Sequence, residues 1–150
     1  MSDHYQRPGW FTNNVSNRIV AGLTRLGLSV LGSRVLEVRG RSSGQWRRTP
    51  VNLLVLDGER YLVAPRGHTQ WVRNLRVSGE GRLVLGRRRE AFTATEVGDD
   101  AKPPLLRAYL KRWKAEVGVF FDGVSADSPE ADVVRIAPDH PVFRIETTTP

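Results

Sequence analysis

The chain contains no cysteine. This absence excludes disulfide bonds, zinc sites built on thiolates, iron–sulfur clusters and a thiol nucleophile, and it gives no sign of an oxidising compartment. Long apolar runs are also missing, since no window approaches the roughly 20 apolar residues that span a bilayer. The N-terminal stretch MSDHYQRPGWFTNN lacks the apolar segment of a secretory signal. The sequence therefore predicts a cytoplasmic protein.

Acidic residues are in deficit. There are 16 Asp and Glu residues against 23 Lys and Arg residues, which gives a net charge of +7 and a pI of about 10.7. Such an excess favours anionic partners, for example nucleic acid, a phosphorylated cofactor or the acidic face of a membrane. Charge alone does not choose among these classes.

The length of 150 residues and the hydrophobic content of 39% predict one globular domain, residues 1–150. Residue spacing predicts helices over 13–28, 69–78, 99–113 and 128–136, and strands over 35–38, 51–56, 61–64, 81–85, 90–97 and 141–145. The dipeptide Asp57-Gly58 joins two of these strands as a hairpin. Hairpins dominate and no βαβ alternation is visible. The predicted fold class is therefore α+β, mainly antiparallel β, as a barrel with helices packed outside.

The stretch RGRSSGQWRRTP, residues 39–50, gathers four arginines around a Ser-Ser-Gly turn between two predicted strands. A turn of this kind can aim backbone N–H groups into a concavity, and flanking guanidinium groups add charge-assisted bonds to phosphate oxygens. The alternative interpretation is a solvated hairpin whose arginines serve only solubility. Neither GxxxxGK[ST] nor GxGxxG is present, so neither common nucleotide motif applies.

A second stretch, APRGHTQWVRNL, residues 64–75, leads from a strand into a helix that begins near Thr69. A helix N-terminus next to Arg66 is a natural site for an anion. The alternative is an ordinary connecting loop, with Trp71 and Leu75 packed in the core.

Side chains for acid–base or metal chemistry are scarce. The three histidines, His4, His68 and His140, do not stand at ligand spacing, and neither HExxH nor GxSxG occurs. No metal site is predicted, and the catalytic residue is unknown from the sequence. If the protein is an enzyme, a cofactor performs the chemistry while the protein orients it.

Taken together, the motifs resemble the deazaflavin-dependent nitroreductase and quinone reductase family of actinobacteria. The order is a strand, GRSSGQWRRTP at 40–50, the hairpin at Asp57-Gly58, the loop APRG at 64–67, and then WVRNL at 71–75. The later stretches LLRAYLKRW and HPVFRIE also look like this family. The resemblance covers about residues 15 to 147.

This resemblance implies a split β-barrel, the fold of FMN-binding oxidases, that holds coenzyme F420, a deazaflavin with a ribityl phosphate and an anionic oligoglutamate tail. It implies an oxidoreductase that transfers a hydride from reduced F420 to a small electron-poor acceptor such as a quinone, a nitroaromatic or an enone. The cofactor-binding positions implied are Arg41, Ser42, Ser43, Gly44 and Arg47 at the phosphate, Pro50, Val51, Val63, Ala64, Pro65 and Arg66 along the ring and second loop, and Trp71, Val72 and Asn74 in the segment that closes the site. Arg39 and Arg48 would steer the acidic tail.

Two positions depart from the family pattern. Ser42 stands where many members have lysine, which removes one charge near the phosphate, and no tyrosine is obvious where some nitroreductases place one beside the substrate, with Asn52 near one such position. Alternatives therefore stay open: the same barrel using FMN or haem, or a non-catalytic carrier of an anionic cofactor or lipid. Nucleic-acid binding is disfavoured because no recognised module appears.

The predicted helix 13–28 carries an apolar face with two arginines beside it. Two interpretations remain, a helix that covers the core and a helix that rests on an anionic surface. The second would place the protein at the inner face of the cell membrane through weak peripheral contact. The resemblance is compatible with a monomer or a homodimer.

Overall fold

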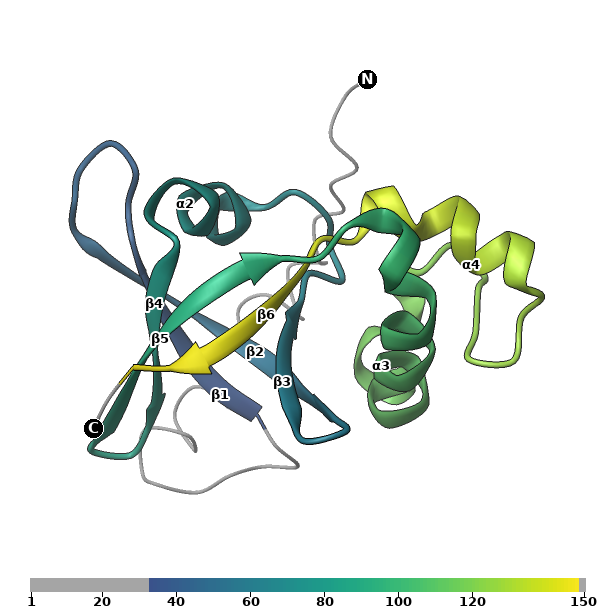
Figure 1. Ribbon diagram of the computed structural model, residues 1–150, viewed down its shortest axis with the longest axis horizontal. Helices are drawn as coiled ribbons and strands as arrows, with labels where there is room; N and C mark the ends of the chain where they lie inside the picture. The colour runs from purple at the N-terminus through teal and green to yellow at the C-terminus, as the bar shows by residue number, and fades with distance from the viewer. Residues whose placement is uncertain (1–32, 149–150) are drawn as a thin grey trace.

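The computed structural model describes residues 33–148, and over that range six strands close into an antiparallel barrel (Figure 1). The strands neighbour one another in the order β1-β2-β3-β6-β5-β4, with β4 returning to β1. Their bounds are β1 Ser33–Arg39, β2 Trp46–Leu56, β3 Glu59–Val63, β4 Glu80–Leu85, β5 Arg88–Glu96 and β6 Val142–Thr147. The predicted mainly antiparallel barrel is confirmed.

The helices lie outside the barrel, as predicted. In Figure 1, α2 lies beside β4 and close to the long β1–β2 hairpin, whereas α3 and α4 lie together beyond β3 and β6. Short 3-10 turns flank the second group. The bounds are α2 Gln70–Ser78, η2 Asp99–Ala101, α3 Lys102–Val117, η3 Gly118–Phe120, α4 Glu130–Ile136 and η4 Ala137–Asp139.

The hairpin between β2 and β3 turns at the predicted dipeptide. Asp57 has φ 52° and Gly58 has φ 79°, both in the left-handed region that a two-residue type I′ turn requires. Asp and Gly adopt this conformation at little cost, which explains why the register places Leu56 directly opposite Glu59.

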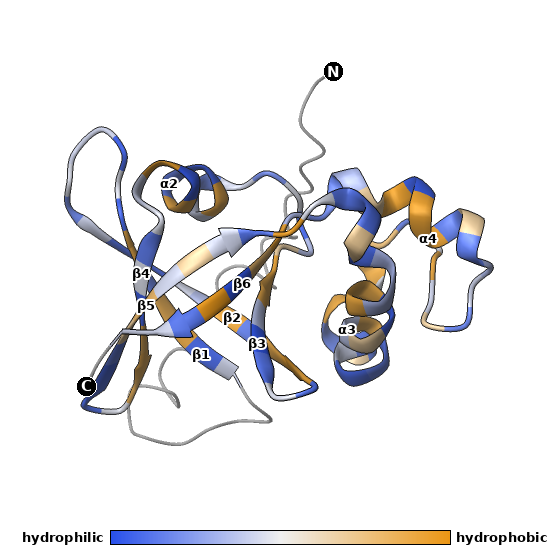
Figure 2. Ribbon diagram, in the orientation of Figure 1, coloured by the Kyte–Doolittle hydropathy of each residue, from blue (hydrophilic) through white to orange (hydrophobic). Residues whose placement is uncertain are grey.

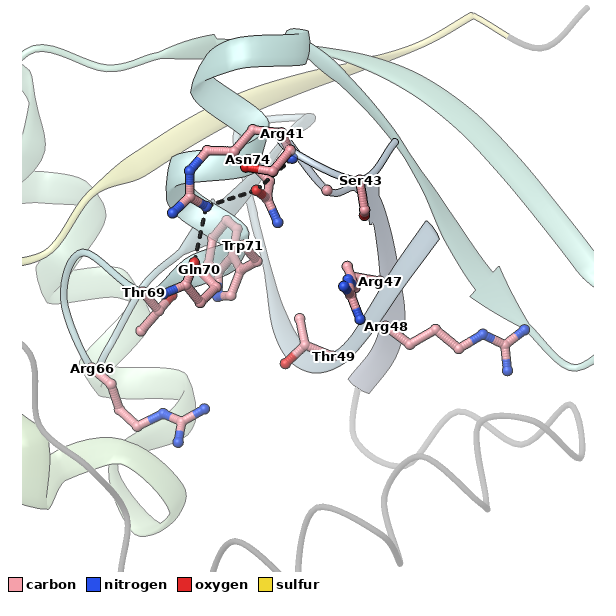
Figure 3. A pocket seen from close by; sticks show the side chains of 12 residues that line it. Arg41, Ser43, Arg47, Arg48, Thr49, Arg66, Thr69, Gln70, Trp71 and Asn74 are labelled. Carbon is pink, nitrogen blue, oxygen red and sulfur yellow. Dashed lines mark hydrogen bonds between the residues drawn. The ribbon is translucent and has the colours of Figure 1, made fainter. Parts of the chain in front are cut away.

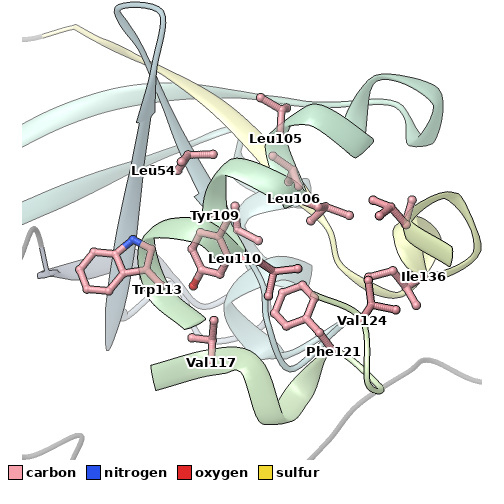
Figure 4. Close-up of a cluster of buried hydrophobic side chains, with 14 residues drawn as sticks. Leu54, Leu105, Leu106, Tyr109, Leu110, Trp113, Val117, Phe121, Val124 and Ile136 are labelled. Atoms are coloured by element: carbon pink, nitrogen blue, oxygen red, sulfur yellow. The ribbon is translucent and has the colours of Figure 1, made fainter. Parts of the chain in front are cut away.

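Two hydrophobic cores hold the fold together. One fills the barrel and is closed by α2, through side chains that include Leu36, Leu62, Phe92 and Phe143. The other lies between α3, α4 and the outer faces of β2, β3 and β6 (Figure 4). Figure 2 shows apolar segments alternating with polar ones along the strands, and apolar segments on both α3 and α4. The helices are thus part of the folded unit.

Strand β2 begins earlier than predicted. The expectation was a start at Val51, but the ladder with β1 already pairs Arg39 with Trp46 and Val38 with Arg47. The polar run 46–49 has no apolar alternation, so the β-rich run in the sequence begins only at Val51, although Arg47 was expected near the start of this strand. In the structure its backbone is paired with β1, so Arg47 and Arg48 belong to β2.

The predicted helix 13–28 lies outside the described residues. Among the helices that the structure does describe, none combines the length and the apolar character needed to traverse a bilayer.

Candidate functional site

A cavity of about 510 Å³ opens beside α2 (Figure 3). Three segments far apart in the sequence supply its walls: the β1–β2 turn with the start of β2, the loop after β3, and the first half of α2. The lining residues are Gly40, Arg41, Ser42, Ser43, Arg47, Arg48, Thr49, Arg66, Thr69, Gln70, Trp71 and Asn74. The two stretches that the sequence singled out therefore meet at one site.

The β1–β2 turn is held in shape by its own backbone. The Gly40 N–H donates to the Gln45 carbonyl oxygen at 2.8 Å, and the Gly44 N–H donates to the Gly40 carbonyl oxygen at 2.9 Å. A Cβ atom at position 40 would lie 2.8 Å from the Ser43 hydroxyl oxygen, so a larger residue would push that side chain away. The turn is consequently a compact, preformed element at the cavity wall.

Helix α2 fixes Arg41 from the opposite wall. The side-chain oxygen of Asn74 accepts the Arg41 backbone N–H at 3.0 Å and the Arg41 guanidinium at 2.8 Å. The same guanidinium nitrogen donates to Gln70 at 2.9 Å, as Figure 3 shows. Asn74 is buried, with 5% of its surface exposed. The arginine therefore enters the cavity in a defined orientation.

Arg48 is positioned by a buried carboxylate behind the cavity. Glu37 is 2% exposed and lies opposite Arg48 on the β1–β2 ladder. Its carboxylate accepts Arg48 Nε at 2.7 Å and lies 2.9 Å from Arg82 and 3.4 Å from Arg89. Burial raises the pKa of Glu37, but the Arg48 hydrogen bond and the three arginine charges outweigh it, so the pKa is lowered. The charged form of Glu37 thus anchors the arginine at the rim.

The remaining wall comes from the strand-to-helix segment. Trp71 is half-buried, and its ring centroid lies 6.0 Å from that of Phe143 in the barrel core. Its contact with the core gives the cavity one flat aromatic surface. Arg66 and Thr69 lie at the end of the cavity where α2 begins.

The cavity is strongly cationic. Among the described lining residues there are four arginines, at positions 41, 47, 48 and 66, and no Asp or Glu. Hydroxyl groups, the two amides of Gln70 and Asn74, an indole and Gly40 complete the lining. This combination suits an elongated anion that carries both phosphate-like oxygens and a planar ring.

Neither described histidine lines this cavity. His68 Nε2 lies 3.0 Å from the Pro138 carbonyl oxygen and its Nδ1 lies 3.1 Å from Arg76. His140 is buried, stacks on Phe121 at 4.1 Å between ring centroids and contacts the Ala64 carbonyl oxygen at 3.3 Å. Both rings therefore join segments of the fold outside the cavity lining.

Seven of the fourteen predicted cofactor-binding residues line the cavity: Arg41, Ser42, Ser43, Arg47, Arg66, Trp71 and Asn74. The other seven do not. Val51, Ala64 and Val72 are buried in the barrel core and Val63 in the core beneath α3 and α4. Gly44, Pro50 and Pro65 flank the cavity segments in the sequence without joining the lining. A direct contact between these seven residues and a cofactor stays a prediction.

The cofactor-binding set predicted from the sequence omits five lining residues: Gly40, Arg48, Thr49, Thr69 and Gln70. Thr69 and Gln70 could have been found from the sequence. A Thr before a run with helical spacing of apolar residues indicates the N-terminus of a helix, and helix N-termini bind anions. The family resemblance had already assigned Arg48 to the acidic tail of the cofactor. For Thr49 the signal is the strand register, which only the fold reveals.

Comparison with known proteins gives a family and a fold. The chain matches the family model of the F420H(2)-dependent quinone reductases over residues 6–126. No curated protein matches the chain.

Three solved structures illustrate the fold. The protein Atu2129 from Agrobacterium tumefaciens is 16% identical with a TM-score of 0.57, over 99% of this chain and 60% of that one, so this chain spans about three fifths of its length. An F420-H2 dependent reductase, FDR-A, is 18% identical with a TM-score of 0.51, over 77% of this chain and 94% of that one. Rv2991 from Mycobacterium tuberculosis is 17% identical with a TM-score of 0.52, over 99% of this chain and 87% of that one. At such identities the likeness establishes the split-barrel fold alone.

Proposed function

The chain belongs to the F420H(2)-dependent quinone reductase family, and from this premise we propose that the arginine-lined cavity binds reduced F420 and presents it to a small electron-poor acceptor. Membership in this family confirms the predictions of an oxidoreductase and of F420 as its cofactor. The individual residues, the range of acceptors and the location in the cell are parts of the proposal.

The cavity fits the phosphate of such a cofactor. The preformed turn carries the hydroxyls of Ser42 and Ser43, and the guanidinium groups of Arg41 and Arg47 line the same wall. Arginine binds phosphate oxygens in a planar, bidentate manner, and the described lining offers no carboxylate to compete. Arg48, anchored on Glu37, extends the positive surface of the cavity. Arg39, on the same hairpin, is proposed to meet further carboxylates of the tail.

The half-buried Trp71 provides the surface for the ring. Its contact with Phe143 fixes the indole from behind, so a planar group can stack on it without reorganising the wall. When bound, reduced F420 supplies a hydride. The task of this chain is then to orient the ring and the acceptor and to exclude water between them.

The acceptor class follows from the family and from the cavity's chemistry. Quinones are the acceptors in the family's description, and we extend the proposal to nitroaromatics and activated enones, which also develop negative charge on oxygen when reduced. No His, Asp or Glu is among the described residues that line the cavity, so protons reach the reduced acceptor from solvent.

The proposal places the enzyme in the cytoplasm, as a monomer or a homodimer that does not bind nucleic acid. Weak contact of the 13–28 segment with the membrane would bring it close to lipid-soluble quinones. The domain is proposed to comprise the whole chain, residues 1–150.

The observation that carries the proposal is the meeting of four arginines with a serine turn and an indole in one cavity. Titration of the purified protein with F420 and with FMN, followed by fluorescence, tests it directly. We expect F420 to bind at least about tenfold more tightly, because its tail adds carboxylates that reach the basic rim. Equal affinities, or FMN retained through purification, would instead favour the FMN-binding alternative. Tight F420 binding without reduction of any quinone would favour a carrier.

A further inference from the structure

Thr69 has a buried hydroxyl without a hydrogen-bond partner among the described residues. Its side chain lines the cavity, and only 8% of the residue is exposed. Burying a hydroxyl without a partner is unfavourable by about 1–3 kcal/mol, and folded proteins seldom leave such groups unpaired. A group of this kind inside a binding cavity points to a ligand that completes it.

The same residue stands at the N-terminus of α2. Thr69 is the N-cap residue of this nine-residue helix, yet its side chain makes no capping hydrogen bond. The first intrahelical hydrogen bond runs from the Arg73 N–H to the Thr69 carbonyl oxygen. The N–H groups of residues 70–72 therefore have no acceptor within the helix. The first turn holds no acidic residue. The dipole of α2 and the Thr69 hydroxyl thus favour the same kind of ligand group, an oxygen atom that carries negative charge.

This end of the cavity is distinct from the serine turn. Asn74, which fixes Arg41, lies five residues along α2 from Thr69, or about 7.5 Å at the helical rise. Arg66 lies at the Thr69 end, and Trp71 lies between the two ends in sequence. The cavity therefore has two places for negative charge with an aromatic wall between them.

We propose that Thr69 and the N-terminus of α2 bind the oxygen of the electron acceptor that becomes negatively charged during reduction. This inference rests on the proposed function above. A quinone gains a hydride, which is two electrons and one proton, while reduced F420 is oxidised. The quinone oxygen that is left with the negative charge is held by the Thr69 hydroxyl and then takes one proton from solvent, which gives the hydroquinone. Preorganised donors at such an oxygen stabilise the transition state.

The test compares Thr69→Val with Thr69→Ser, because valine keeps the shape and serine keeps the hydroxyl. Thr95→Val, on an exposed position of β5, is the control for the loss of a threonine hydroxyl elsewhere. The probe is 2-hydroxy-1,4-naphthoquinone, which is titrated onto the F420-loaded protein. Its anion carries a negatively charged oxygen on a quinone ring, like the acceptor after hydride transfer. Menadione reduction and F420 affinity are measured on the same samples.

We expect Thr69→Val to bind the anionic probe about tenfold more weakly and to reduce menadione with about a tenfold lower kcat/KM. F420 affinity should stay at the wild-type value, and Tm should not fall, because valine removes a buried hydroxyl that has no partner among the described residues. Thr69→Ser and Thr95→Val should behave like the wild type. Unchanged probe binding in Thr69→Val would overturn the inference. So would a loss confined to F420 affinity, since Thr69 would then hold the cofactor. If the wild type does not bind F420 at all, the proposed function itself fails, and this outcome is distinguishable from the other two.

Discussion

The side-chain oxygen of Asn74 accepts two hydrogen bonds from Arg41, one from the backbone N–H at 3.0 Å and one from the guanidinium at 2.8 Å. One amide on α2 therefore sets both the position of the β1–β2 turn and the direction of its first arginine. The residues are 33 apart in the sequence, and their contact ties the two motifs into one site. Its loss should therefore weaken cofactor binding as well as folding.

Substitution of Asn74 by leucine tests this relationship. Leucine has a similar size but accepts no hydrogen bond, so both Arg41 donors lose their shared partner. We expect a stability loss of about 1–3 kcal/mol and a fall in F420 affinity of roughly tenfold or more. Hydrogen exchange at the Arg41 amide should become faster. Gln70→Ala removes only an exposed bond to the same guanidinium and should have a smaller effect. Equal F420 affinity in Asn74→Leu and wild type would contradict the assigned role.

Arg47 offers a cleaner test of the phosphate site because it is exposed and lines the cavity. We expect Arg47→Ala to fold normally and to bind F420 roughly 10- to 100-fold more weakly, since one charge-assisted hydrogen bond contributes about 1.5–3 kcal/mol. The remaining affinity should depend less on ionic strength, because one screened contact is gone. Titrations at low and high salt measure both effects.

Arg87→Ala is the matched control, since Arg87 is an exposed arginine in the β4–β5 turn. It removes the same net charge away from the cavity. If Arg47→Ala and Arg87→Ala weaken binding equally, the arginines act only through overall charge, and the solvated-hairpin interpretation of the sequence is the right one.

The sequence was informative where local chemistry determines structure. The Asp57-Gly58 turn, the strand runs and the acidic start before α3 all follow from residues close in the chain, and each is present in the structure. The arginines of the β1–β2 turn could also be singled out from the sequence, because guanidinium groups flanking a Ser-Gly turn are suited to an anion, although a solvated hairpin remained the alternative.

What the sequence could not provide depends on pairing between distant segments. Arg48 becomes a rim residue because the β1–β2 register sets it opposite Glu37. Val63 and Ala64 were predicted beside the ring, but the end of β3 turns their side chains into the two cores. The burial of Val72 follows from its place three residues before Leu75 on the apolar face of α2, and its contact with a cofactor stays a prediction.

Trp113 joins the outer helices to the barrel, and its replacement should weaken the whole domain. The indole is 1% exposed, and its Nε1–H donates to the Leu53 carbonyl oxygen of β2 at 3.1 Å. In Trp113→Phe this carbonyl loses its buried donor and a void opens, so we expect the free energy of unfolding in urea to fall by about 2–4 kcal/mol.

Trp46→Phe serves as the comparison for Trp113→Phe. Trp46 is half-buried and lies between the guanidinium groups of Arg39 and Arg82, which stand 4.4 and 3.6 Å from its ring centroid. Its replacement loses part of a cation–π contact and should lower stability by about 1 kcal/mol or less. Similar losses in the two variants would show that the Leu53 hydrogen bond contributes little.

Acid should destabilise the barrel partly through Glu90. Two guanidinium nitrogens of Arg60 donate to its carboxylate at 2.9 and 2.7 Å. The Arg60 hydrogen bonds lower the pKa of Glu90 to about 2; burial opposes this, while Thr147 and the arginine charges add to it. An unfolded Glu has a pKa of about 4.3. The carboxylate therefore stabilises the folded state above about pH 4.3, and this contribution is lost as the pH falls towards 2.

Urea unfolding of wild type and Glu90→Gln between pH 7 and pH 2 measures this contribution. The Glu90 side chain is 35% exposed, and solvent screening therefore limits its contribution to about 1 kcal/mol. We expect the wild type to be more stable than Glu90→Gln by this amount at pH 7 and the two to converge near pH 2. Thr147→Val, which removes one donor to the carboxylate, should lie between them at neutral pH. If the difference in free energy of unfolding between wild type and Glu90→Gln is the same at every pH, Glu90 acts through packing, because only a carboxylate that titrates makes this difference depend on pH.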